Sequence, residues 1–340
     1  MTYARPPATG RALRLHMNEN TAGCSPAVVR TLAAMTPQEI ASYPDYGPIT
    51  ARCDDLFGVP EGWVQLTNGL DEGLHAVSQS MPPAFQALVV EPAFEMYAIG
   101  VEAAGGTVTH VPPEPDFRFP IEAVLRWSTP APRVIFLTDP NNPTGLSLPA
   151  GAVEQIAGAA PDALVVVDEA YADFSGRSSL PLLDRFRNLV VGRTFAKGHG
   201  LAGLRIGALV GHPDTLAPIQ RQLPPYSVNA CAIRALDVAL EDADYLRRRV
   251  AEAAESKALV YDACRRLGLT CWPSDANFVL VRIGPDAPAI VAELAAQDIV
   301  IRDRSTQPGC AGCVRFTAMV VEHTRRCLVA LEAALASRRD

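Results

Sequence analysis

The sequence lacks a long apolar segment. None of its apolar runs reaches the roughly 18 residues that a helix needs to span a bilayer. Its first twenty residues, MTYARPPATGRALRLHMNEN, contain no apolar core of the length found in signal peptides. These absences predict a cytoplasmic protein that does not associate with membranes.

An excess of positive charge is also missing. Lysine and arginine number 30 against 37 aspartates and glutamates, which gives a formal net charge of −7. We therefore expect neither nucleic acid nor an anionic membrane as a partner. With 340 residues, 49% of them apolar, the chain is long enough for one large domain and a smaller one.

Cysteine is present but does not suggest a disulfide framework. The eight cysteines are spread through a long chain without a secretion signal, so we expect free thiols. Cys310, Cys313, His323 and Cys327 have a spacing that resembles a zinc site. However, Cys327 continues an apolar helical stripe, where cysteine packs as a small hydrophobe, and we expect no bound metal.

Short apolar runs alternate with helical patterns in the first two-thirds of the chain. Unbroken runs of this kind are typical of parallel strands covered on both faces, and the alternation indicates an α/β layer fold. The runs lie at 87–92, 133–140, 163–170 and 188–195.

The rest of the chain has a different pattern. Long helical stretches at 229–244 and 244–267 are followed by strands and helices that indicate a smaller α+β unit. We predict an N-terminal arm and part of the small domain at 1–35, a large cofactor-binding domain at 36–235, and a small domain at 236–340.

Lys197 lies where an apolar run ends and a glycine-rich turn begins, and two interpretations compete. Residues 198–203, GHGLAG, match the dinucleotide fingerprint G-x-G-x-x-G, but that motif must open a helix. The following LRIGALVG indicates a strand instead, so we reject this fingerprint, and a nicotinamide oxidoreductase stays only as a remaining alternative. The alternative is that Lys197 forms a Schiff base with pyridoxal phosphate.

Polar residues at the other strand ends supply what this cofactor needs. Asp168 can keep the pyridine nitrogen protonated, Asn142 and Tyr171 can donate to the ring oxygen, and Phe94 can cover the ring. For the phosphate, Gly69, Leu70 and Asp71 open a helix and Arg205 supplies a cation. These residues occupy the carboxyl ends of the predicted strands, where ligands bind in open α/β sheets.

In combination these motifs resemble those of fold-type I pyridoxal-phosphate aminotransferases, especially the histidinol-phosphate aminotransferase group. The resemblance extends over nearly the whole chain. It includes LHMNEN (15–20), YPDY (43–46), LTNGLDEGL (66–74), VEPAFEMY (90–97), DPNNPTG (139–145), VVVDEAYADF (165–174), RTFAKGHGLAGLRIG (193–207) and VRFT (314–317).

The resemblance implies roles for further residues. Tyr43 would reach the cofactor phosphate of a neighbouring subunit, making a homodimer the functional unit. Arg315 and Arg302 would bind the substrate carboxylate or phosphate. The other candidate site residues are Thr194 for the cofactor, and Asn20, Ala22 and His199 for the substrate. The implied partners are an amino donor and a 2-oxo acid acceptor.

Several positions depart from the family pattern and leave the substrate open. Ala196 stands where the family usually has a serine that bonds the cofactor phosphate. The group usually has an aromatic residue shortly after the lysine, in the pattern K-A-F/Y-G, and this chain has Gly198-His199-Gly200 there. Thr21-Ala22-Gly23 replaces the usual Pro-Tyr-Gly, and Ala318-Met319 replaces Gly-Thr.

These departures weaken histidinol phosphate as the substrate more than they weaken transamination. We expect an aminotransferase with a specialised amino-acid substrate. Histidinol-phosphate aminotransferase proper and a threonine-phosphate-type decarboxylase are alternatives. A non-catalytic cofactor-binding protein is a third.

Overall fold

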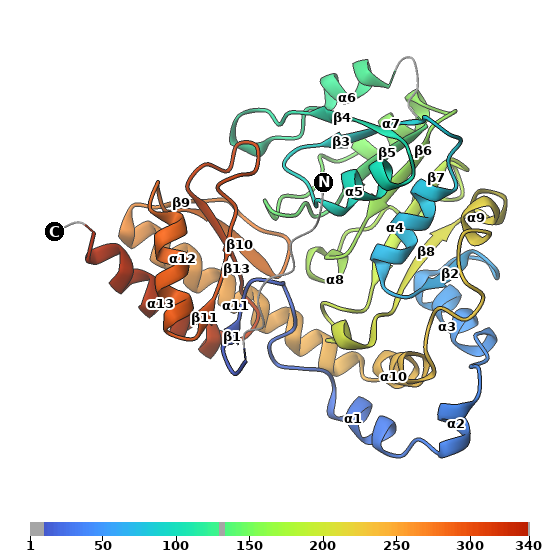
Figure 1. Cartoon of the computed structure of the whole chain (residues 1–340), viewed down its shortest axis with the longest axis horizontal. Helices are drawn as coiled ribbons and strands as arrows, with labels where there is room; N and C mark the ends of the chain where they lie inside the picture. Colours follow the sequence, from blue (N-terminus) through green and yellow to red (C-terminus); the bar gives the residue numbers. More distant parts are fainter. Residues whose placement is uncertain (1–9, 129–132, 339–340) are drawn as a thin grey trace.

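A computed structural model describes residues 10–128 and 133–338 of the chain. A seven-stranded sheet lies at the centre of its N-terminal two-thirds, in the order β2-β8-β7-β6-β5-β3-β4 (Figure 1). Strand β8 is antiparallel to its neighbours β2 and β7, and the other pairs are parallel. The strands are β2 (Val64–Thr67), β3 (Gln86–Val90), β4 (Thr107–Val111), β5 (Val134–Thr138), β6 (Leu164–Asp168), β7 (Leu189–Thr194) and β8 (Gly207–Gly211).

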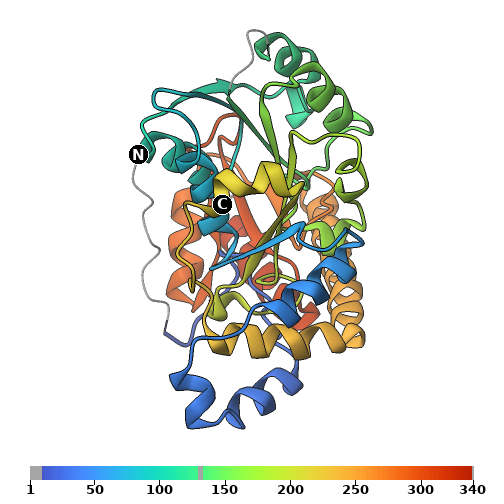
Figure 2. The same ribbon diagram turned by 90° about the vertical axis from the view of Figure 1, so that its right-hand side faces the viewer.

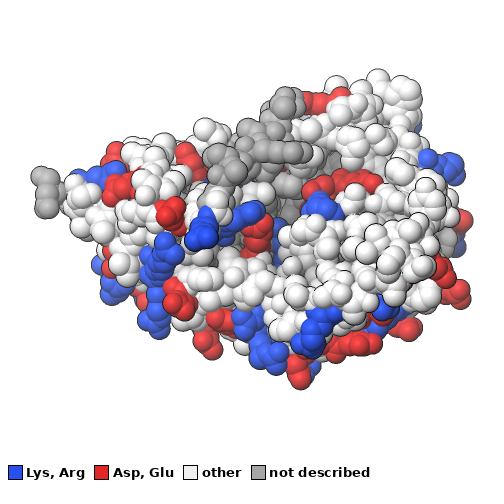
Figure 3. Space-filling view, turned by 60° about the horizontal axis from the view of Figure 1, so that its bottom comes forward, with Lys and Arg blue, Asp and Glu red and all other residues white. Residues whose placement is uncertain are grey.

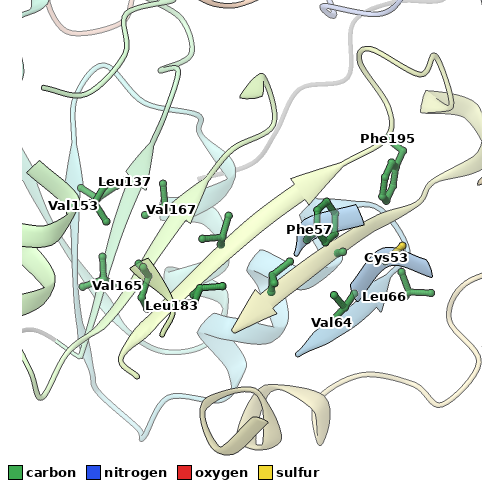
Figure 4. Packing of buried hydrophobic residues seen from close by; sticks show 14 of the residues in the cluster. Cys53, Phe57, Val64, Leu66, Leu137, Val153, Val165, Val167, Leu183 and Phe195 are labelled. Carbon is green, nitrogen blue, oxygen red and sulfur yellow. The ribbon is translucent and has the colours of Figure 1, made fainter. Parts of the chain in front are cut away.

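Helices cover both faces of this sheet. Successive side chains of a strand point to opposite faces, so Ile135 and Leu137 of β5 pack in one core while Val134 and Phe136 pack in the other. Figure 4 shows part of the first core, with Leu137, Val165 and Val167 on adjacent strands. Helices α1 (Pro26–Ala33), α3 (Gly47–Phe57), α6 (Ile121–Trp127), α7 (Ala152–Ala159) and α10 (Ala230–Glu241) contribute to it. Helices α4 (Leu70–Gln79), α5 (Met96–Ala103) and α9 (Pro213–Gln220) contribute to the second.

A second, smaller sheet has the order β12-β13-β10-β9 and only antiparallel pairs. Its strands are β9 (Thr270–Cys271), β10 (Phe278–Arg282), β12 (Arg302–Asp303) and β13 (Cys313–Thr317). Helices α11 (Ala243–Leu267), α12 (Ala287–Ala296) and α13 (Val321–Ala336) pack against it in a separate core. The α/β fold class with a mostly parallel sheet is therefore confirmed, whereas the domain boundaries given above stay a prediction.

The N-terminal segment joins the two parts of the chain. Strand β1 (Leu13–Arg14) pairs in parallel with β11 (Ile299–Val300), and Leu15 enters the core of the C-terminal part. Helix α1 then packs beside α10 at the far end of the molecule, as Figures 1 and 2 both show. The remaining elements are α2 (Pro37–Ala41), α8 (Ala172–Ser175) and the 3-10 turns η1 (Pro115–Phe117), η2 (Leu180–Leu182) and η3 (Ala202–Leu204).

The residues of the zinc-like pattern do not share one environment. Cys310 and Cys313 pack with Trp272 and Leu280, whereas Cys327 lies in the core beneath α13. Within 10–128 and 133–338, no three His, Cys, Asp or Glu side chains are placed to hold a metal ion. All eight cysteines are free thiols.

The charged side chains on the surface and the polarity of the helices agree with the amino-acid composition. On the face shown in Figure 3, lysine and arginine side chains are interspersed with aspartate and glutamate. None of the helices in the described part of the chain is long and apolar enough to cross a membrane.

Candidate active site

A cavity of about 740 Å³ lies at the carboxyl ends of β5, β6 and β7, bounded on its other side by the smaller sheet. Most of the residues proposed from the sequence line it. They are Leu70, Asp71, Phe94, Asn142, Asp168, Tyr171, Thr194, Lys197, Arg205, Arg302 and Arg315. The parallel strands explain this convergence, because their carboxyl ends meet at one edge of the sheet.

Asp168, the last residue of β6, is a buried carboxylate beneath the cavity. Tyr97 donates a hydrogen bond from its hydroxyl to Asp168 Oδ2 at 2.6 Å, and the amide of Ala170 donates to Oδ1 at 2.9 Å. Burial raises the pKa of Asp168 to about 6, although the hydrogen bond from Tyr97 opposes this rise. A cation placed in the cavity beside the carboxylate would stabilise its charged form.

Lys197 follows β7 and reaches the same cavity. Its Nζ donates to the carbonyl of Met17 at 3.1 Å and lies 5.9 Å from the centre of the Tyr171 ring. The Tyr171 hydroxyl accepts a hydrogen bond from Asn18 Nδ2 at 2.9 Å. The N-terminal segment thus passes over the site and contacts two of its predicted catalytic side chains.

The opposite end of the cavity combines a helix N-terminus with a cation. Helix α4 begins at Leu70 after Gly69, whose φ of 77° lies in the left-handed region. Glycine is required there because L side chains rarely adopt this φ, and a Cβ at residue 69 would in addition meet the Arg205 guanidinium. Arg205 Nη2 lies 3.0 Å from Asp71 Oδ2, and the arginine is exposed. Free amides and a guanidinium together form an anion-binding corner.

Arginines line the wall formed by the smaller sheet. Arg315 is buried on β13, where it donates to Asn142 Oδ1 and, at 2.7 Å, to the carbonyl of His16. Burial and the charges of Arg304 and Arg302 lower the pKa of Arg315 to about 9. His16 is also buried, and burial together with neighbouring arginines lowers its pKa to about 4, so its imidazole is neutral.

Some predicted site residues do not line this cavity. Asn20 is buried and donates to the carbonyl of Gly198 and to the Tyr245 hydroxyl, while its Oδ1 accepts from the amide of Ala22 at 3.1 Å. His199 is buried with its ring centre 5.6 Å from that of Phe195, and burial lowers its pKa.

Tyr43 lies on the surface, 79% exposed, and stacks on Tyr226. Gly69 stands behind the cavity wall rather than in it, next to Arg205. The roles proposed for these residues stay predictions.

Sequence patterns missed several residues that do line the cavity. They are Arg14, His16, Asn18, Glu95, Tyr97 and Arg304. Tyr97 lies inside a helical apolar pattern and Arg304 in a loop, so neither stood out. Asn18 had a usable signal, because it belongs to the same NEN motif as Asn20.

Comparisons with known proteins identify the family of the chain. The model of the family "Aminotransferase class I and II" matches residues 11–331. The chain belongs to the class I and II aminotransferases. It is 36% identical, over 96% of its length and 89% of the relative's, to histidinol-phosphate aminotransferase 2 of Ralstonia nicotianae.

Two solved structures are also similar to this aminotransferase. The histidinol-phosphate aminotransferase of Sinorhizobium meliloti, in complex with pyridoxal-5'-phosphate, superposes with a TM-score of 0.91 at 26% identity, covering 99% of this chain and 96% of that one. L-threonine-O-3-phosphate decarboxylase of Porphyromonas gingivalis has a TM-score of 0.81 at 22% identity over 95% and 99%, a likeness that shows the fold alone. The predicted family, the enzyme class and dependence on pyridoxal phosphate are confirmed.

The residues of the cavity suit that cofactor. The Asp168 carboxylate is buried and hydrogen-bonded only to neutral donors in the described structure, so it matches a protonated ring nitrogen. The corner at Gly69 and Arg205 matches a phosphate. Lys197 supplies the amine between these two ends.

Proposed function

We propose that this aminotransferase moves an amino group between an anionic amino donor, in the first instance an amino acid, and a 2-oxo acid. The observation that carries the proposal is the placement of Lys197 and Arg315 on one cavity with the buried Asp168. One side chain handles protons, one binds the substrate anion and one fixes the cofactor.

Each of these groups has a defined task at the site. Arg315 binds the substrate carboxylate through its planar fork, held in place by Asn142 and the carbonyl of His16. Lys197 Nζ carries the proton to and from the substrate Cα. The bound cofactor supplies an electron-accepting ring. Asp168 holds a proton on the ring nitrogen, and the carboxylate is itself held by Tyr97.

Histidinol phosphate is the second candidate donor. The support for it is the 36% identity to a protein named for that substrate, together with arginines able to bind a phosphate. The altered residues Ala22 and Met319 favour the amino-acid donor instead.

A donor screen on the purified holoenzyme tests the proposal. Loss of the visible absorbance of the lysine-bound cofactor is followed with common amino acids, cationic amino acids and histidinol phosphate. Formation of the oxo product without carbon dioxide is expected, and release of carbon dioxide would favour a decarboxylase. Lys197→Ala should lose both the absorbance and the activity, whereas the matched variant Lys257→Ala, remote from the cavity, should retain both.

We also propose that the functional unit is a homodimer in the cytoplasm, with Tyr43 reaching the neighbouring site. Two exposed aromatic side chains support the dimer: Tyr43 and Tyr226, which stack with ring centres 4.4 Å apart. A single-chain mass in solution would contradict this. So would a failure of Tyr43→Phe and Lys197→Ala chains, each impaired alone, to restore activity when mixed.

A further inference from the structure

Three arginines share one face of the smaller sheet. Arg302 lies directly opposite Arg315 in the β12–β13 register, so their side chains point to the same face. The amide of Arg304 donates to the carbonyl of Cys313 at 2.9 Å, which continues the ladder by two residues. Since side chains alternate along a strand, Arg304 points to the same face, and all three arginines line the cavity.

The charges on this wall do not balance. Within 10–128 and 133–338, no carboxylate lies within salt-bridge distance of Arg302 or Arg315. Crowding of the guanidinium groups is what lowers the pKa of Arg315, beyond the effect of its burial. One substrate carboxylate neutralises one of these charges, so the wall suits a ligand with more than one negative charge.

The Arg304 side chain is held by one ion pair, but not all of its N–H groups have hydrogen-bond partners. Its Nη1 lies 2.7 Å from Glu95 Oε1, while its Nε is buried without a hydrogen-bond partner. Only 6% of the Arg304 side chain is exposed, against 30% for Glu95. The glutamate comes from the opposite wall, next to Phe94 at the start of α5, and also accepts from Gln307 at 3.2 Å. Glu95 is therefore the partner of this pair that can turn toward solvent.

We propose that Arg304 binds a second anionic group of the substrate, a carboxylate or a phosphate, and that Glu95 takes that place when the group is absent. A substrate with such a group displaces Glu95, and one without it leaves Arg304 paired. One cavity thus accepts amino and oxo substrates of different charge without exposing a lone buried cation. The inference rests on the proposed aminotransferase function.

The test compares kcat/KM for glutamate and for alanine in the holoenzyme. Arg304→Gln is expected to lower the glutamate-to-alanine ratio about tenfold or more, since a charge-assisted contact is lost. Glu95→Gln is expected to raise the ratio about threefold or more, because the competing carboxylate is gone while a hydrogen-bonding side chain remains. The ratio of kcat/KM for histidinol phosphate to that for histidinol makes the same comparison for a phosphate. If the substitutions change the ratio for only one of the two substrate pairs, that pair identifies the anion that Arg304 binds.

The two substitutions are expected to change the ratio in opposite directions. If the Arg304–Glu95 contact only held the two parts of the chain together, both substitutions would act in the same direction. Ser147 donates to Asp275 at 2.7 Å across the same two parts, outside the cavity, so Ser147→Ala is the control and should leave the ratio unchanged. If both variants lower the ratio, or neither changes it, the inference is wrong. If Arg304→Gln does not fold, the Glu95→Gln ratio decides alone. The proposed function fails separately, when no donor changes the cofactor absorbance of the wild type.

Discussion

Replacing Asp168 by asparagine should stabilise the protein when pyridoxal phosphate has been removed, although it should abolish activity. Burial raises the pKa of this carboxyl from 3.8 to about 6. The folded state therefore holds an extra proton between these two values, and stability is lost as the pH rises through about 4 to 6. Above pH 6 the full cost of the buried charge is present, and asparagine removes that cost.

The magnitude follows from the same values. A rise from 3.8 to about 6 corresponds to about 3 kcal/mol of destabilisation at pH 7. Asparagine keeps one acceptor oxygen for the two donors, Tyr97 and the Ala170 amide, so about 1 kcal/mol is lost with the other hydrogen bond. We expect Asp168→Asn to gain about 1–2 kcal/mol at neutral pH.

Thermal unfolding of the cofactor-free proteins at pH 4.5 and pH 8 measures this difference. The variant should unfold at a higher temperature than wild type at pH 8 and at nearly the same temperature at pH 4.5. Added pyridoxal phosphate should stabilise wild type more than the variant. Asp242→Asn provides a control of opposite sign, because a hydrogen bond from Ser25 lowers the pKa of Asp242, so this substitution should cost stability at pH 8. A cofactor-free Asp168→Asn protein no more stable than wild type at pH 8 would refute the reasoning.

Three further substitutions probe the cofactor and substrate ends of the site. Tyr97→Phe removes the hydrogen bond that lowers the pKa of Asp168, so the carboxyl should take up its proton at a higher pH than in wild type. As the pH is lowered, cofactor affinity should therefore begin to fall at a higher pH. Cofactor affinity measured from pH 8 to pH 5 with an unchanged midpoint would contradict this. Gly69→Ala drives a methyl group into the Arg205 guanidinium, and equilibrium dialysis should show cofactor affinity reduced about tenfold or more. Arg315→Lys loses the planar fork, so steady-state kinetics should show KM for the donor raised about tenfold at unchanged cofactor absorbance; unchanged KM would argue against carboxylate binding there.

Most of the large sheet could be predicted from short-range patterns. The apolar runs at 133–140, 163–170 and 188–195 contain strands β5, β6 and β7, because a strand covered on both faces is apolar throughout. The continuous apolar-to-polar run IVIRD (299–303) divides at Ile301 into β11 and β12, which pair in different sheets. A strand pattern carries no information about which partner each of its residues finds.

The site was predictable where it depended on the ends of strands. Asp168 and Lys197 each follow an apolar run, so their meeting at the cavity follows from parallel pairing. His199 was proposed from its departure from the family pattern; it does not line the cavity, because the chain turns after Lys197, with the Gly200 amide donating to the Lys197 carbonyl at 3.2 Å. Arg304 reaches its place beside Glu95 only through a contact between distant segments, which no local pattern records.

The parallel pairing of β1 with β11 makes the catalytic centre depend on the order in which the chain is made. Leu13 pairs with Ile299, and the carbonyl of His16 accepts from Arg315, so segments from opposite ends of the sequence close the same wall. All strands of the cofactor edge lie in the sequence up to β8, whereas the substrate wall needs β12 and β13. The substrate wall therefore depends on strands that come later in the sequence than every strand of the cofactor edge.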